Sequence, residues 1–266
     1  MGNSQKLGTA AITGASSGLG AVFAERLAKR GYDLKLVARR QDRLIALAEK
    51  LQDKYAVRVT TLVADLSSVS DIEKIVNDLS NDKDITLLIN NAGTSTMAPL
   101  TQTPWKKQKA MIDVNITAVV LLTNAVLPGF VDRNTGVLIN ISSVMALHSL
   151  PVSALYSASK AFVSLYTRGL QQELKDTGIQ VQLVNPSATA TEIWEVGGVP
   201  LSQLDENSIM TVEDCVDAAL SGLDNKELES YPSVESLTVI EAYDKAASDL
   251  FAAAQSGKPA SRYNNR

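Results

Sequence analysis

Short apolar segments alternate along the chain with longer segments that carry apolar residues at helical spacing, and this alternation most constrains the fold. The segments expected to be strands are 9–13, 32–38, 57–64, 85–90, 136–142 and 179–185. The helices expected between them are 21–30, 41–55, 67–80, 103–128 and 153–176. Parallel strands need a crossover between them, which is usually a helix. The sequence therefore predicts an α/β fold with a doubly wound parallel sheet, the Rossmann fold, whose ligands bind beyond the carboxyl ends of the strands.

The pattern changes after Pro186. Residues 187–210 show no clear periodicity, and so long a loop in a compact domain is usually functional or disordered. We expect it to be a substrate loop that forms a flap over the site. Thr211 then resembles the first residue of a capping box and predicts a helix to about residue 220, while 228–231 can supply a short seventh strand.

The C-terminal part is expected to add a helix. Apolar residues recur on one helical face after Ser233, and the segment 256–266 is polar enough to be a flexible tail. A chain of 266 residues is near the upper size of one domain, so we predict a single domain over 1–266.

Composition limits the partners. The chain is 45% hydrophobic with a net charge of -4, so nothing attracts it generally to nucleic acid or to an anionic membrane. The single Cys215 excludes an internal disulfide and fits a reducing compartment. No apolar run of the roughly 18 residues needed to span a membrane is recognised, and no metal site is predicted. We therefore expect a soluble, cytoplasmic protein that acts on a small molecule.

A glycine-rich turn joins the first expected strand to the first helix. Gly14, Gly18 and Gly20 lack side chains that would keep a phosphate from backbone N–H groups and the positive end of the helix dipole. The spacing departs from Gly-x-Gly-x-x-Gly, so a tight turn with close helix packing is the alternative interpretation. The position still favours a dinucleotide.

The end of the second expected strand indicates which dinucleotide. An NAD site has an acidic residue there for the ribose diol, but this chain has Ala38 followed by Arg39 and Arg40. Guanidinium groups can hold a 2′-phosphate, so NADP is favoured over NAD. The alternative is that both arginines are solvated charges at the start of a helix.

The same turn also matches a different motif. Gly14-Ala15-Ser16-Ser17-Gly18 fits the Gly-x-Ser-x-Gly nucleophile elbow in its strand-turn-helix context, which raises a serine hydrolase as an alternative. Such an enzyme needs a histidine base, and His148 is the only histidine in the chain. No glycine-rich oxyanion loop precedes the turn, so this hypothesis is the weaker one.

Seven elements in register resemble the short-chain dehydrogenase/reductase family over roughly residues 7–192. They are Thr13-Gly14-Ala-Ser-Ser-Gly18-Leu-Gly20, Asp65-Leu66, Asn90-Asn91-Ala92-Gly93, Asn115, Ser142-Ser143, Tyr156-x-x-x-Lys160 and Asn185-Pro186. The resemblance implies a nicotinamide-dependent oxidoreductase, of the NADP-preferring carbonyl reductase type, with a catalytic tetrad. Its members here would be Asn115, Ser143, Tyr156 and Lys160.

The chemistry of hydride transfer accounts for these residue types. Transfer to a carbonyl carbon leaves negative charge on the oxygen, which needs a hydrogen-bond donor and a proton source. Ser143 and Tyr156 would fill these roles, and the Lys160 ammonium one helical turn from Tyr156 would lower the pKa of the phenol. The resemblance further implies that Lys160 holds ribose hydroxyls and that Asn115 positions a water. A Tyr and a Lys at this spacing also occur by chance on solvated helices, so the pair alone is weak evidence.

The resemblance also assigns cofactor contacts. The predicted set is Gly14, Ser16, Ser17, Gly18, Leu19, Gly20, Arg39, Arg40, Asp65, Leu66, Asn91, Ala92, Gly93, Tyr156, Lys160, Pro186, Thr189 and Thr191. Asp65 and Asn91 also favour turns without any ligand. Ser187 stands where the family has a glycine after Pro186, which puts the detailed contact there in doubt.

Residues beside Ser143 and in the loop after the sixth strand are expected to form a mainly apolar substrate pocket. The predicted set is Met145, His148, Leu150 and Trp194. The frequent family ending is absent, so we expect a homodimer through the helices after the fourth and fifth strands, with a tetramer possible. A regulator that binds NADP without turnover remains a third interpretation of the function.

Overall fold

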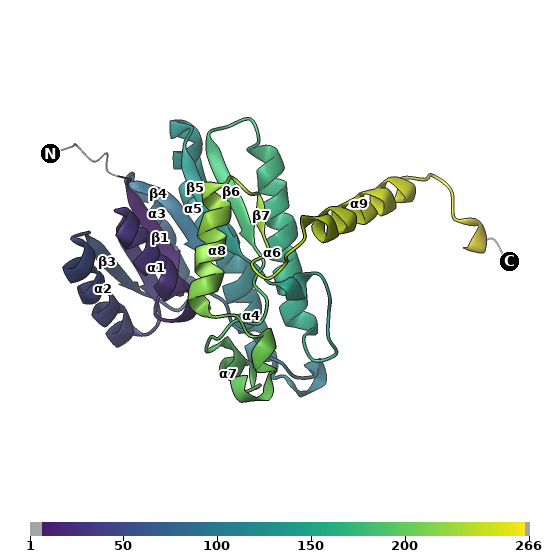
Figure 1. Ribbon diagram of the computed structural model, residues 1–266, viewed down its shortest axis with the longest axis horizontal. Helices are drawn as coiled ribbons and strands as arrows, with labels where there is room; N and C mark the ends of the chain where they lie inside the picture. The colour runs from purple at the N-terminus through teal and green to yellow at the C-terminus, as the bar shows by residue number, and fades with distance from the viewer. Residues whose placement is uncertain (1–6, 264–266) are drawn as a thin grey trace. The chain divides into compact units, whose positions relative to one another are not determined.

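A parallel sheet of seven strands forms the centre of the structure, a computed structural model that describes residues 7–263 (Figure 1). Its strands are β1 Thr9–Thr13, β2 Asp33–Ala38, β3 Val59–Val63, β4 Ile85–Asn90, β5 Gly136–Ile141, β6 Ile179–Val184 and β7 Glu229–Ser230. Their order is β3-β2-β1-β4-β5-β6-β7, so the winding direction reverses between β1 and β4. Ligands of such sheets bind at this reversal, beyond the carboxyl ends of the strands. The predicted doubly wound Rossmann fold is confirmed, including its short seventh strand.

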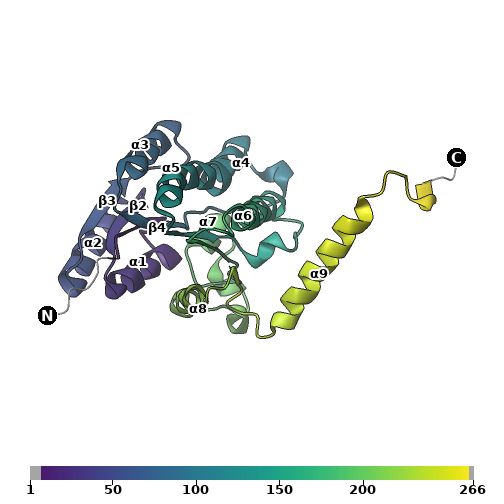
Figure 2. The same cartoon turned by 90° about the horizontal axis from the view of Figure 1, so that it is seen from above.

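Helices cover both faces of the sheet (Figure 2). On one face lie α1 Gly18–Arg30, α2 Gln41–Tyr55 and α8 Val212–Asp224; on the other lie α3 Val69–Asn81, α4 Trp105–Ile112, α5 Ala118–Arg133 and α6 Ala154–Glu173. Each face has its own hydrophobic core, and β1 contributes to both: Ala10 and Ile12 to one, Ala11 to the other. Alternate residues of a strand point to opposite faces, so a strand covered on both sides is apolar throughout.

Two helix boundaries follow the expected chemistry. Gly31 ends α1 with φ 96°, a left-handed conformation that glycine adopts without strain. Thr211 precedes α8, and its hydroxyl accepts a hydrogen bond from the Asp214 backbone N–H at 3.0 Å. The predicted cap of α8 is thereby confirmed.

The long helix expected over 103–128 differs from the structure. A π-helical turn, Asp113–Thr117, separates α4 from α5, and α5 continues through Pro128 to Arg133. Proline removes one helix hydrogen bond, but Val126 before it and Phe130 after it are buried in the core, so packing holds both halves. The run Trp105–Arg133 is long and apolar enough to cross a membrane, contrary to the sequence analysis. Of its most apolar window, 44% is buried inside the protein.

The segment 187–210 is more regular than its sequence predicts. It contains the short helix α7 Ile193–Gly197 and two 3-10 turns, Leu201–Gln203 and Glu206–Ser208. A parallel bridge between Thr189 and Met210 brings the two ends of the segment together. The segment is therefore a closed loop anchored beside the end of β6.

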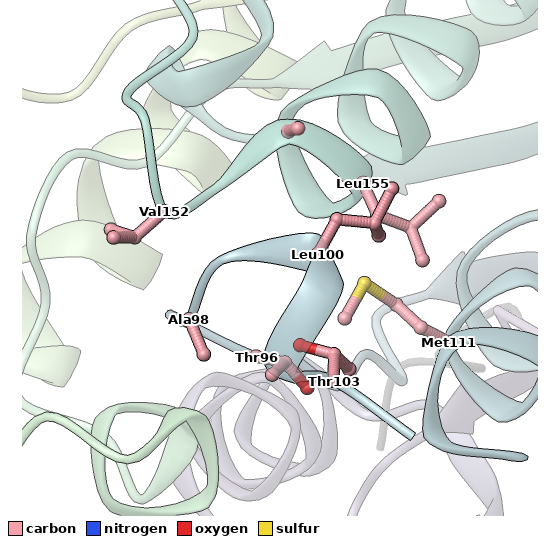
Figure 3. A pocket seen from close by; sticks show the side chains of 8 residues that line it. Thr96, Ala98, Leu100, Thr103, Met111, Val152 and Leu155 are labelled. Carbon is pink, nitrogen blue, oxygen red and sulfur yellow. The ribbon is translucent and has the colours of Figure 1, made fainter. Parts of the chain in front are cut away.

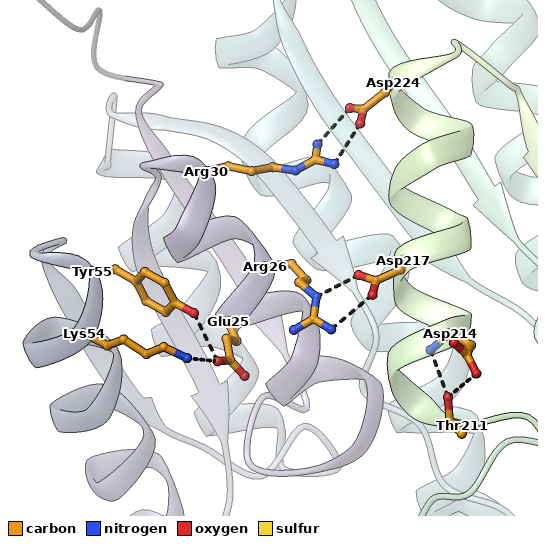
Figure 4. Close-up of polar contacts among 9 residues, drawn as sticks. All are labelled: Glu25, Arg26, Arg30, Lys54, Tyr55, Thr211, Asp214, Asp217 and Asp224. Atoms are coloured by element: carbon orange, nitrogen blue, oxygen red, sulfur yellow. Dashed lines mark hydrogen bonds and ion pairs between the residues drawn. The ribbon is translucent and has the colours of Figure 1, made fainter.

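Ion pairs tie α8 to α1 across a surface groove (Figure 4). Arg26 meets Asp217 through two hydrogen bonds of 2.7 and 3.1 Å, and Arg30 meets Asp224 through two of 2.8 Å. Hydrogen bonding to Asp217 raises the pKa of Arg26. These pairs are partly exposed, so each adds less than about 1 kcal/mol, but their forked geometry fixes the position of α8, which begins where the closed loop ends.

Contacts divide the chain into two units, Met1–Pro232 and Ser233–Arg266. The first holds the sheet and all of the predicted site residues. The second contains α9 Leu237–Ala254, none of whose side chains is buried, and a 3-10 turn at Ser261–Tyr263. The single domain expected over 1–266 did not include this division, and the last three residues of the predicted tail 256–266 lie outside the described residues.

Candidate active site

The glycine turn forms a cradle at the start of α1. Gly14 and Gly18 have φ values of 68° and 53°, which side chains rarely allow. A Cβ at Gly14 would lie 2.9 Å from the Cα of Ala92, and one at Gly20 would collide with the carbonyl oxygen of Gly14. Ser17, at the N-cap, makes no side-chain cap, so the first N–H groups of α1 remain available to an anion. This cradle fits the diphosphate of a dinucleotide.

Asn91 supports the turn from β4. Its Nδ2 donates to the carbonyl of Thr13 at 2.8 Å, and the Thr13 hydroxyl accepts from the backbone N–H groups of Asn91 and Ala92, each at 3.0 Å. The predicted cofactor contact Asn91 therefore holds the phosphate turn in shape with its side chain.

The predicted adenosine contacts lie at the ends of β2 and β3. Arg39 is exposed, with its NH1 3.9 Å from Asp65 Oδ2, while Asp65 Oδ1 accepts from the backbone N–H and the hydroxyl of Ser67. Leu66 is buried in the core of one face of the sheet, and the partly buried Leu19 packs against the core of the other face. Asp65 thus shapes the turn after β3 with one oxygen and faces the arginine with the other.

Arg40 lies across the glycine turn instead of pointing into solvent. It donates to the hydroxyl of Ser16 at 3.1 Å and to that of Ser17 at 2.6 Å. Its NH1 also meets Glu192 at 2.6 Å, and Arg43, one turn along α2, meets the other oxygen of Glu192 at 2.6 Å. Hydrogen bonds from Arg43 and then Arg40 lower the pKa of Glu192 to about 2.

The surroundings of Ser16 argue against the serine hydrolase hypothesis. Within residues 7–263 the side chain that hydrogen-bonds to the Ser16 hydroxyl is the Arg40 guanidinium, which has no lone pair to accept a proton. His148 lies exposed in the segment between β5 and α6.

Tyr156 and Lys160 lie inside the protein on α6, with exposed fractions of 7% and 4%. The Lys160 ammonium donates to the carbonyl of Ile141 at 2.9 Å and lies 5.9 Å from the centre of the Tyr156 ring. Ser143 is buried two residues beyond β5, and its side chain lies beside the Tyr156 phenol. The structure thereby brings Ser143, Tyr156 and Lys160 together at the carboxyl ends of the strands.

Ser142 and Ser143 have different surroundings. The Ser142 hydroxyl donates to the Lys160 carbonyl at 2.8 Å and pairs with Ser164, so it joins β5 to α6. The Ser143 hydroxyl accepts from the Met145 N–H at 3.1 Å. This difference agrees with Ser143 as the tetrad member.

Burial dominates the titration of the Tyr–Lys pair. It raises the pKa of Tyr156 to about 12, opposed by the neighbouring Ser143 side chain, and lowers the pKa of Lys160 to about 8. The expected lowering of the phenol pKa by Lys160 is therefore wrong for the protein alone. The phenol is protonated at neutral pH and suited to give a proton.

Asn115 sits in the π-helical turn between α4 and α5 and is 1% exposed. Its Nδ2 donates to the Thr94 carbonyl at 2.9 Å and to the Ser159 hydroxyl at 3.0 Å, and its Oδ1 accepts from the Thr94 N–H. A Cβ at Gly93 would lie 3.5 Å from Lys160 Nζ and 3.7 Å from Asn115 Oδ1. The π turn thus places Asn115 near the ammonium, and π turns often mark functional sites.

The segment after β6 closes beside this group. The Pro186 carbonyl accepts from the Val144 N–H at 3.0 Å, and the Thr189 carbonyl accepts from Trp194 Nε1 at 2.9 Å. Thr191 lies against the glycine turn, since its Cγ2 would be 3.2 Å from a Cβ at Gly18. Pro186, Thr189 and Thr191 therefore span the distance from Ser143 to the phosphate cradle.

The predicted substrate residues do not line the small apolar cavity next to the start of α6 (Figure 3). Its walls come from the segment after β4, from α4 and from the residues before Tyr156: Thr96, Ala98, Leu100, Thr103, Met111, Val152, Ala154 and Leu155. Leu150 and His148 are exposed, while Met145 and Trp194 are half-buried. An apolar pocket was expected, but the residues that form this cavity were missed.

Sequence reasoning also missed four polar residues that join the site. Arg43 was detectable, because it follows Arg40 at the helical spacing of three. Glu192 gave no signal, since its partner Arg40 is 152 residues away in the chain. Thr94 and Ser159 hold Asn115 and have no recognisable spacing to it.

Comparison with known proteins agrees with this geometry. A family model described as short chain dehydrogenase matches residues 8–197, and the chain belongs to this family. A very-long-chain 3-oxoacyl-CoA reductase of Anas platyrhynchos is 38% identical over 191 residues, which cover 70% of this chain and 61% of that protein. A protein of Homo sapiens named inactive hydroxysteroid dehydrogenase-like protein 1 is 37% identical over 69% of this chain and 56% of its own length. The chain thus spans roughly three fifths of the length of these relatives.

Solved structures match a larger share of the chain. A short-chain dehydrogenase from Sphingobium yanoikuyae in complex with NADPH is 42% identical, with a TM-score of 0.93 over 97% of this chain and 100% of that one. A bulky-bulky ketone specific alcohol dehydrogenase from Comamonas testosteroni is 35% identical, with a TM-score of 0.89 over 97% of this chain and 99% of that one. The Sphingobium yanoikuyae structure contains NADPH, a dinucleotide of the kind that the cradle fits.

Proposed function

We propose that the protein is an NADP(H)-dependent carbonyl reductase, or an alcohol dehydrogenase in the reverse direction, with Tyr156 as the general acid or base. The observation that carries the proposal is the buried Tyr156 phenol, beside Ser143 and close to the Lys160 ammonium, at the carboxyl ends of the strands. Ketones, aldehydes and secondary alcohols are the substrate class that such a group serves.

The cofactor supplies the hydride when it is bound. Ser143 donates a hydrogen bond to the carbonyl oxygen as negative charge develops on it, and Tyr156 gives that oxygen its proton. A pKa of about 12 keeps the phenol protonated at neutral pH, which favours reduction. For alcohol oxidation the phenol must first lose its proton, which a pKa of about 12 disfavours at neutral pH.

NADP is preferred over NAD in this proposal because of the charges at the end of β2. Ala38 leaves no acid for a ribose diol, and Arg39, which is exposed and lies 3.9 Å from Asp65, can turn to a 2′-phosphate. The Sphingobium yanoikuyae enzyme and an L-sorbose reductase from Gluconobacter frateurii, 26% identical with a TM-score of 0.74 over 84% of this chain and 94% of that one, are both complexes with NADPH. They support the assignment.

A second function, an NADP-binding regulator without turnover, is favoured by one relative whose printed name calls it inactive. The buried group of Asn115, Ser143, Tyr156 and Lys160 argues against it here, because a regulator does not need a proton donor at that place. The two functions differ in a single measurable property, turnover.

We also propose a homodimer through α4, α5 and α6, with a tetramer as the alternative, in the cytoplasm. The outer surfaces of these helices expose Ile112, Leu121, Phe162 and Leu165. Burial of such apolar side chains favours association.

The test is a panel of ketones, aldehydes, sugars and sterols, followed by the loss of NADPH absorbance and repeated with NADH. We expect turnover of at least one carbonyl compound, with NADPH preferred. Tight NADPH binding without turnover of any compound would instead support the regulator.

A further inference from the structure

Glu192 occupies an unusual place for an acidic residue. It belongs to the segment after β6, yet its carboxylate meets guanidinium groups at the start of α2, on the far side of the glycine turn. Glu192 Oε2 meets Arg40 and Oε1 meets Arg43, each at 2.6 Å. One carboxylate therefore joins two arginines to a segment about 150 residues away in the chain.

The same segment is attached on the opposite side of the crevice. The Ser95 hydroxyl donates to the Ile193 carbonyl at 2.8 Å, and the Met97 N–H donates to the Gly197 carbonyl at 2.8 Å. Ser95 and Met97 follow β4, whereas Arg40 and Arg43 follow β2, so these attachments flank β1, the strand whose end carries the glycine turn. Thr191 lies directly over that turn at Gly18. Residues 191–197 therefore form a strap across the crevice.

Of the two attachments, the Glu192 side is the one that can open. The side-chain exposed fractions of Arg40, Arg43 and Glu192 are 42%, 51% and 42%, so water and salt compete for these charges. Ser95 is buried. The strap is therefore attached by a buried contact at Ser95 and by solvent-exposed ion pairs at Glu192.

We propose that Glu192 is a positioning residue that latches the strap 191–197 over the phosphate cradle and so sets how fast the dinucleotide exchanges. The proposal rests on the proposed use of NADP(H), but the latch acts on NAD(H) in the same way. Glu192 pairs with Arg40 and Arg43 and not with Arg39, which faces Asp65 at 3.9 Å, so the latch leaves Arg39 to a 2′-phosphate. A pKa of about 2 keeps Glu192 charged throughout the neutral range, so the latch does not respond to pH there.

The test measures dissociation of NADPH and of NADH from Glu192→Gln by stopped flow, without substrate. The readout is the fluorescence of Trp194, which lies in the strap, in a Trp105→Phe background because Trp105 is exposed and outside the site. Two exposed ion pairs are lost, so we expect both cofactors to leave roughly 3- to 10-fold faster. Glu195→Gln, an exposed acid in the same strap, is the matched control and should leave the rates unchanged.

The sign of the change is decisive. Loss of a negative charge near a phosphate site would by itself slow the release of an anion, so slower release of NADPH from Glu192→Gln would overturn the latch and make Glu192 a competitor for the arginines. Unchanged rates would overturn it as well. Rising salt should speed release from the wild type and much less from the variant.

A failure of the proposed NADP preference gives a different experimental result from a failure of the latch. Arg39→Ala should weaken NADPH and spare NADH if the 2′-phosphate assignment holds. An equal effect on both would reject the NADP preference and leave the latch intact.

Discussion

Lys160 carries an ionisable amine into the interior, where it finds one hydrogen-bond acceptor, the carbonyl of Ile141. Burial lowers its pKa from 10.5 to about 8, which means that the charged form is less stable in the folded protein than in the unfolded chain. As pH falls from 10.5 to about 8, the unfolded chain takes up a proton that the folded protein does not bind, so stability is lost through this window. Burial of Lys160 therefore lowers the free energy of unfolding at neutral pH.

Lys160→Met should make the protein more stable while removing turnover. At pH 7 we expect a gain of about 2 kcal/mol in the free energy of unfolding, after about 1 kcal/mol is deducted for the lost hydrogen bond. The gain should shrink as pH rises from about 8 to 10.5, where the lysine becomes neutral in both states. Urea unfolding at pH 7 and pH 10 measures it, with exposed Lys109→Met as control. A variant less stable than the wild type at pH 7 would contradict this account of the burial.

At the scale of single elements, the turn before α1 shows why a glycine is needed where helix propensity disfavours it. Gly20 lies within α1, and alanine is ordinarily the better helix former by about 1 kcal/mol. Here a Cβ would meet the Gly14 carbonyl oxygen and, at 2.6 Å, Asn91 Nδ2. Both atoms belong to the phosphate cradle and its support.

Gly20→Ala should therefore destabilise the protein by about 2 kcal/mol or more and weaken NADPH binding, because the backbone of the turn must move. Gly169→Ala is the matched change on α6, where a Cβ meets nothing within 4 Å. It should stabilise the protein by about 0.5–1 kcal/mol and leave binding alone. Thermal unfolding and NADPH titration of both variants check the pair, and equal effects would count against the steric argument.

The sequence predicted most of the strands and helices, but not all of their details. Alternating apolar segments predicted the strands, since local periodicity records which face of each strand is covered. The same local reasoning failed at Pro128, where burial of Val126 and Phe130 outweighs the missing hydrogen bond. The π turn that holds Asn115 lies inside the stretch expected to form one helix over 103–128.

The candidate site divides in a similar way. Ser143, Tyr156 and Lys160 could be named because their spacing follows a motif, and the structure brings them together. Glu192 could not, because only the folded chain brings it to Arg40. The titration of Tyr156 was misjudged for a related reason: burial depends on every element packed around the phenol.

At the scale of the whole molecule, the proposed homodimer depends on exposed apolar residues of α4, α5 and α6. Leu165 on α6 is 70% exposed, so Leu165→Glu should convert the proposed dimer to a monomer without changing the midpoint of unfolding of the monomer in urea. Size-exclusion chromatography with light scattering measures the mass. A wild-type protein that is already a monomer at all concentrations would reject the dimer.

The central claim is that Tyr156 transfers the proton in an NADPH-dependent carbonyl reduction. NADPH consumption with a responsive ketone should fall by about 10²- to 10⁴-fold in Tyr156→Phe, while NADPH binding persists. Tyr166→Phe is the matched control, because it makes the same change on the same helix, α6. It should retain near wild-type turnover, since Tyr166 stacks on Phe162 and is not part of the group formed by Ser143, Tyr156 and Lys160. Unchanged turnover in Tyr156→Phe would contradict the proposed mechanism.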